Sequence, residues 1–137
     1  MARIRLPQPD GSVAVHEMGS PAAFSRPSAE LTSRRAFAAV HVVADPLADN
    51  TPGLPASLDW DATLAFRRHL WSWGLSVADA MDTAQRGMGL DWDTTRELIT
   101  RSVKESIAEG GGIACGASTD QLPPEVVELG RIVDAYQ

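Results

Sequence analysis

The sequence predicts an α/β fold: a (βα)3 segment, the first strands of a (β/α)8 TIM barrel, preceded by an N-terminal β-hairpin. Short apolar runs alternate with amphipathic segments that begin near aspartate and end at glycine. The six residues LDWDAT, from Leu58, recur as LDWDTT from Leu90, a shift of 32 residues. A period of this size is typical of βα repeats, and eight such units would fill about 250 residues, the size of a complete barrel. Coincidence is the alternative, because an aspartate cap before an aromatic residue is common.

The first 35 residues are predicted to form a hairpin and an irregular connection. Residues 3–6 and 12–16 alternate polar and apolar side chains around the turn sequence Pro-Asp-Gly at 9–11. Residues 17–35 contain glycine, proline and serine without a sustained period. We therefore divide the chain into residues 1–35 and residues 36–137, the second part being three βα units of a truncated barrel.

Three strands are expected in the second part. Residues 36–44 form a near-continuous apolar run, which is typical of a strand buried on both faces of a parallel sheet. Residues 75–81 and 113–117 are shorter apolar runs of the same kind. The helices between them predict parallel strands joined by crossovers.

Three helices follow these strands. The first is expected to begin after Ser57 or Asp59, and the second after Asp91 or Asp93. The third is expected to begin at the prolines 123 and 124, because proline suits the first turn of a helix. The apolar positions expected to face the core in the second helix are Leu98, Ile99, Val103 and Ile107.

Composition excludes several classes of protein. The 137 residues are 44% hydrophobic and 22% charged, with a formal net charge of −6, so the chain lacks the basic surface of a nucleic-acid binder. We find neither an apolar run long enough to cross a membrane nor a signal peptide, which predicts a cytoplasmic protein. The single cysteine excludes an internal disulfide and a cysteine-based zinc site. We expect no cofactor and no metal.

Candidate binding residues follow the predicted strands, because functional groups of a barrel gather at the carboxyl ends of its strands. The residues selected in this way are Asp45, Asp82, Thr83, Arg86, Ser118, Thr119 and Asp120. We predict a substrate-binding set of Asp45, Asp82, Thr83, Arg86 and Ser118. An arginine and a hydroxyl on one loop could bind a carboxylate or a phosphate. In the alternative, Asp82 and Thr83 cap local turns and Arg86 pairs with Asp82 or Asp91.

Other reactive side chains are predicted to be structural. His41 and Asp45 share a strand face and could contribute to a metal-dependent hydrolase, but a metal site needs three or four ligands, so a packed or hydrogen-bonded histidine is favoured. Lys104 is the only lysine, and we place it on the solvated side of a helix without a catalytic role. Cys115 is expected to be a small buried hydrophobe.

Four stretches, residues 41–45, 58–70, 80–92 and 113–116, resemble the dihydrodipicolinate synthase and N-acetylneuraminate lyase family of class I aldolases. They are closest to an uncharacterised actinobacterial-type branch of that family, and the resemblance covers residues 36–137. In the wider family a Gly-Thr-Thr-Gly-Glu loop contacts the carboxylate of a bound keto acid. The matching segment here is residues 82–86, which keeps only Thr83.

The resemblance implies a lyase that forms a Schiff base between a lysine and the carbonyl group of a small keto acid or related carbonyl substrate. In the family this lysine and a proton-shuttling tyrosine lie on later strands, beyond residue 137. We therefore expect the N-terminal portion of an aldolase, inactive alone and without a catalytic residue of its own. The alternative is a non-catalytic binding or assembly module, which pairs with a second copy or with another chain to complete the sheet.

Overall fold

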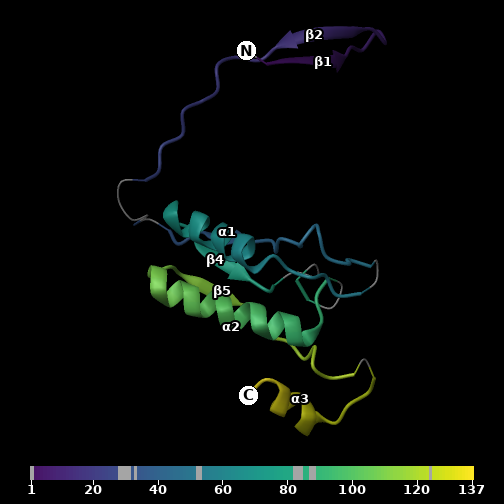
Figure 1. Cartoon of the computed structure of the whole chain (residues 1–137), viewed down its shortest axis with the longest axis vertical. Helices are drawn as coiled ribbons and strands as arrows, with labels where there is room; N and C mark the ends of the chain where they lie inside the picture. Colours follow the sequence, from purple (N-terminus) through teal and green to yellow (C-terminus); the bar gives the residue numbers. More distant parts are fainter. Residues whose placement is uncertain are drawn as a thin grey trace.

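The computed structural model describes residues 2–27, 32, 34–51, 54–81, 85–86, 89–123 and 125–137. Five strands and three helices are assigned in this part of the chain, and they make a mixed α/β arrangement with two small sheets (Figure 1). In chain order they are β1 (Arg3–Pro7), β2 (Val13–Glu17), β3 (Phe37–Ala39), α1 (Trp60–Ser72), β4 (Ser76–Asp79), α2 (Trp92–Glu109), β5 (Ile113–Cys115) and α3 (Leu129–Ala135).

The larger sheet has the strand order β3-β4-β5, and both pairs of strands are parallel, as predicted. Its strands are shorter than the apolar runs in the sequence. The prediction that the first of these strands is buried on both faces is wrong, since Phe37 in β3 is 50% exposed. The reason is that, among the described residues, β3 lies at an edge of the sheet and no helix covers one face of the sheet.

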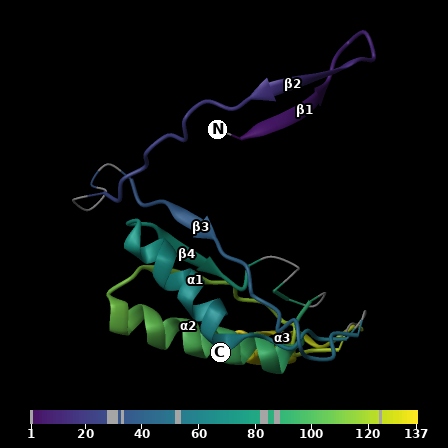
Figure 2. The same ribbon diagram turned by 45° about the horizontal axis from the view of Figure 1, so that its top comes forward.

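Both long helices cover the same face of this sheet (Figure 2). Arg68 of α1 forms an ion pair with Glu105 of α2, and the Arg101 guanidinium lies 4.4 Å from the centre of the Trp60 ring. Asp79 of β4 points toward α1, because it pairs with Arg67 there. By strand alternation the opposite face presents a row of alanines in register, one from each strand: Ala39, Ala78 and Ala114.

Asp59 caps the start of α1 and Asp91 caps the start of α2. The sequence had left Ser57 and Asp93 open as alternative caps. The Asp59 side chain accepts a hydrogen bond from the Ala62 amide at 2.9 Å, and Asp91 accepts one from the Thr94 amide at 2.8 Å. Gly110 ends α2 with a φ of 66°, a left-handed conformation that glycine adopts without strain.

The start predicted for the third helix is wrong. This helix, α3, begins at Leu129, several residues after Pro123, while Pro124 lies outside the described residues. The Val126 side chain is fully exposed and Val127 is only partly buried, so the described residues before Leu129 bury little apolar surface that would favour a longer helix.

The side chains that lie between the long helices and the sheet are mainly polar. The buried residues of α1 are Thr63 and Arg67, and those of α2 include Ser102 and Ser106. Ile107, predicted to face the core, is instead 77% exposed. The buried face of α2 thus runs through Leu98, which is fully buried as predicted, Ser102 and Ser106.

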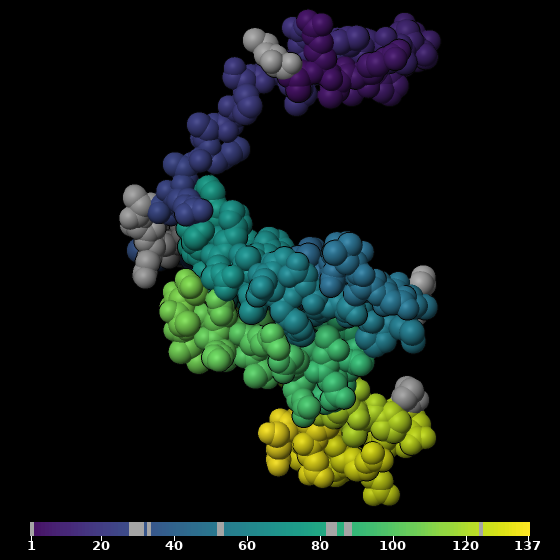
Figure 3. All heavy atoms as spheres, viewed as in Figure 1, coloured from purple at the N-terminus to yellow at the C-terminus, as the bar shows by residue number. Residues whose placement is uncertain are grey.

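The two N-terminal strands form the predicted hairpin. They pair antiparallel with Arg3 opposite Glu17, and these two side chains form an exposed ion pair at 2.6 Å. Gly11 in the turn has a φ of 81°, which favours glycine. A single extended segment of the chain lies between the hairpin and the rest of the molecule (Figure 3). The division into residues 1–35 and 36–137 stays a prediction.

Candidate functional site

A cavity of about 450 Å³ lies where β4 and β5 end. Because the two strands are parallel, their carboxyl ends meet at one edge of the sheet. The described residues that line the cavity are Ala80, Met81, Arg86, Gly116, Ala117, Ser118 and Asp120.

Arg86 links the ends of the two strands across this cavity. Its Nη1 donates to the carbonyl oxygen of Ala80 at 3.1 Å and to that of Gly116 at 2.6 Å. Its Nε donates to Asp120 Oδ2 at 2.5 Å. The Arg86 side chain is only 10% exposed, whereas that of Asp120 is 29% exposed. Three oxygen atoms therefore hold a nearly buried cation at the carboxyl ends of β4 and β5.

Asp120 receives hydrogen bonds from two different directions. Ser118 Oγ donates to Oδ1 at 2.6 Å, while Arg86 occupies Oδ2. The bond from Ser118 is the main cause that holds the pKa of Asp120 below its usual value, and Arg86 lowers that pKa further. The carboxylate is thus ionised at neutral pH and balances the charge of Arg86.

The backbone beside Arg86 is strained. Ala80 follows β4 with a φ of 48°, an uncommon conformation for a residue with a Cβ, which costs roughly 1–2 kcal/mol. Its amide donates to Gln85 Oε1 at 3.0 Å and its carbonyl accepts from Arg86, so both polar groups are fixed. A Cβ at Gly116 would overlap the Ala80 carbonyl oxygen, so the close approach of the two strand ends requires glycine at this position.

The structure brings together two of the five predicted binding residues. Arg86 and Ser118 meet through Asp120. Among the described residues, Arg86 pairs with Asp120, which the strand order brings near, and not with Asp91 as the alternative reading of the sequence proposed. The other partner of that alternative, Asp82, lies outside the described residues, and so does Thr83.

Asp45 has a different role from the one predicted. Its side chain accepts from the Leu47 amide at 2.9 Å, and its own amide donates to the Ser57 carbonyl oxygen. It is not among the described residues that line the cavity. Asp45 therefore organises the turn after β3, because its carboxylate is engaged by the backbone two residues later.

The remaining reactive groups do not form a second centre. His41 is exposed, which contradicts the expected packed or hydrogen-bonded histidine, and Lys104 is exposed on α2 as predicted. Cys115 is half-buried, and burial followed by the nearby Asp79 carboxylate raises the pKa of its thiol. No three acidic, histidine or cysteine side chains within the described ranges lie close enough to hold a metal ion.

A buried ion pair that the sequence analysis missed lies beside the site. Arg67 and Asp79 are both fully buried, and Arg67 Nη2 donates to Asp79 Oδ1 at 2.5 Å. Arg67 also donates to the Thr63 carbonyl oxygen at 2.9 Å. In the described part of the chain Asp79 Oδ2 has no hydrogen-bond partner. The one available signal was an arginine four residues after Thr63, on the face of α1 that points to the sheet.

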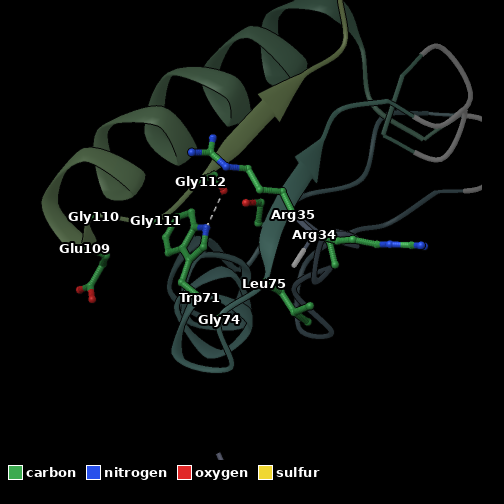
Figure 4. Close-up of a pocket in the computed structure, with 11 residues that line it drawn as sticks. Arg34, Arg35, Trp71, Gly74, Leu75, Glu109, Gly110, Gly111 and Gly112 are labelled. Carbon is green, nitrogen blue, oxygen red and sulfur yellow. Dashed lines mark hydrogen bonds between the residues drawn. The ribbon is translucent and has the colours of Figure 1, made fainter. Parts of the chain in front are cut away.

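A second cavity, of about 440 Å³, lies at the opposite end of the strands (Figure 4). The side chains of Arg34 and Arg35 diverge there, and Trp71 Nε1 donates to the Gly112 carbonyl oxygen at 2.9 Å. The C-terminal ends of α1 and α2 border this cavity, and helix ends of this kind carry partial negative charge.

A sequence model of one protein family, described as "Protein of unknown function (DUF993)", matches residues 4–137. No curated protein matches the chain. Within the described residues, none of the helices is both long and apolar enough to cross a membrane.

Proposed function

Since the chain belongs to the DUF993 family, with nearly its whole length matched, we propose that it is the N-terminal portion of a cytoplasmic (β/α)8-barrel aldolase or lyase. In this proposal it supplies half of a pocket for a small keto acid or a related carbonyl compound. The observation that carries the proposal is the nearly buried Arg86 at the carboxyl ends of β4 and β5.

The arrangement of strands and helices supports a barrel. In a doubly wound sheet the strand order reverses and helices cover both faces. Here the order β3-β4-β5 runs in one direction and α1 lies beside α2 on one face. In a barrel all helices lie outside, and the face with Ala78 and Ala114 would be the interior.

The chemistry of the cavity supports a carboxylate ligand. Arg86 Nη2, which carries two N–H groups suited to a carboxylate, has no hydrogen-bond partner among the described residues. Ser118 adds a hydroxyl close to this guanidinium. A guanidinium of low exposure binds a carboxylate strongly because little water competes with it.

The chain's own residues do not supply the covalent step. A lysine that forms a Schiff base must be partly neutral, which requires burial or a neighbouring cation. Lys104 is exposed on α2, next to Glu105. The proposed reaction therefore takes its lysine from strands outside this sequence, and the 137-residue chain binds the keto acid without turning it over.

The test is a titration of the ¹⁵N-labelled chain with pyruvate, followed by NMR. We expect saturable shifts of the Gly116 and Ser118 amides, which disappear in Arg86→Gln. Arg96→Gln is the matched control, because Arg96 is 68% exposed and lies at the surface with Asp93. Shifts that persist unchanged in Arg86→Gln, or no shifts in the wild type at any accessible concentration, would contradict the proposal.

A second candidate function is a non-catalytic assembly module, and the open sheet favours it. Within the described ranges β3 and β5 each pair with β4 alone, and Phe37 is half exposed on the face without helices. Unpaired strand edges are templates for another chain. Sedimentation of a dimer that dissociates in Phe37→Ser, without any pyruvate binding, would favour this alternative.

A further inference from the structure

The Arg86 side chain is anchored independently of Asp120. Two backbone carbonyl oxygens, of Ala80 and Gly116, accept from Nη1 and fix the plane of the guanidinium. These contacts remain whichever carboxylate lies on the opposite edge. The cation therefore does not need Asp120 to stay in the cavity.

Asp120 occupies the edge that a ligand carboxylate would use. In a guanidinium, the N–H of Nε and one N–H of Nη2 point the same way and bind both oxygens of a carboxylate. Asp120 takes only the Nε position, through Oδ2, while its Oδ1 is turned to Ser118. Asp120 therefore contacts Arg86 through one oxygen atom only, and this contact prevents any other carboxylate from binding Nε and Nη2 together.

The aspartate is the more exposed of the two partners. Its side chain is 29% exposed against 10% for Arg86. It belongs to the segment between β5 and α3, where the described residues form neither helix nor strand. Its second oxygen would keep the Ser118 hydrogen bond after a small rotation away from Arg86.

We propose that Asp120 is a built-in competitor for the ligand carboxylate: a 2-keto acid binds by displacing Asp120 from the Nε edge of Arg86, so Asp120 sets the affinity and selectivity of the site for anions. The inference rests on the proposed function, because it assigns the ligand class to the same cavity. Neutral carbonyl compounds gain no affinity from the displacement of Asp120. Carboxylates with a second polar group, which reach Ser118 as well, gain the most affinity from it.

The experiment compares pyruvate binding to the wild type, Asp120→Asn and Glu125→Gln by NMR titration at fixed salt. Asparagine keeps the shape of the side chain but not its charge, so we expect Kd to fall at least about tenfold, the equivalent of one charge-assisted hydrogen bond. Glu125→Gln removes the same charge from an exposed site in the same segment. There we expect Kd to change by less than about threefold. Equal or weaker binding by Asp120→Asn would overturn the inference.

A second measurement needs no variant. In the wild type, displacement predicts that the side-chain ¹³Cγ resonance of Asp120 shifts as pyruvate saturates the site. Binding that depends on Arg86 but leaves this resonance unmoved would overturn the competitor role and leave the proposed function standing. Binding indifferent to Arg86→Gln would instead overturn the proposed function.

Discussion

Removing the buried arginine of α1 should cost the protein a large part of its stability. Arg67 and Asp79 are both 0% exposed, and Arg67→Met would leave the carboxylate buried without its cation. Breaking a buried pair from one side typically costs about 3–5 kcal/mol. Small domains have about 5–15 kcal/mol in total. We therefore expect the urea midpoint, followed by tryptophan fluorescence and circular dichroism, to fall by about 2 M, or folding to be lost.

The neighbouring position offers a matched control. Arg68 lies on α1 beside Arg67 and pairs with Glu105 of α2, but these side chains are 39% and 24% exposed, so Arg68→Met should cost no more than about 1 kcal/mol. Replacing both partners, as Arg67→Met with Asp79→Leu, removes the unpaired charge and should recover most of the loss. An Arg67→Met variant that is no more destabilised than Arg68→Met would contradict this role of the buried ion pair.

Three further outcomes follow from the structure. Gly110→Ala should lower the free energy of unfolding by about 1–2 kcal/mol in urea titrations, because the φ of 66° disfavours a Cβ although space is open. Asp91→Ala should cost about 1 kcal/mol at pH 7. The side-chain hydrogen bond with Thr94 lowers the pKa of Asp91, so this contribution is complete above the unfolded pKa of about 4 and is lost as the pH falls through the folded value. Incubation with a 2-keto acid and borohydride should leave Lys104 without an adduct by mass spectrometry, and a stoichiometric adduct would contradict its exposed, non-catalytic place on α2.

The local features of the fold were accessible from the sequence. Asp59, Asp91 and Gly110 signal helix ends through their own backbone chemistry, and the hairpin follows from a Pro-Asp-Gly turn between alternating segments. These signals act within a few residues, so the sequence alone contains them. The exposure of Ile107 was not accessible, because helical spacing gives a face but not the direction of that face relative to the sheet.

The candidate site was accessible only in part. The rule that barrel chemistry lies after the strands selected Arg86 and Ser118, and it also marked Asp120 as a neighbour of Ser118. The pairing of Arg86 with Asp120 spans 34 residues, and parallel register creates it, so spacing along the chain could not reveal it. The same rule selected Asp45, whose carboxylate is instead used by its own turn.

The most direct test of the central claim is a crystal structure of the protein soaked with pyruvate. The account predicts a carboxylate in the cavity at the ends of β4 and β5, within hydrogen-bonding distance of Arg86, with Asp120 turned away from Nε. A ligand bound instead in the cavity beside Arg35, at the other end of the strands, would contradict it.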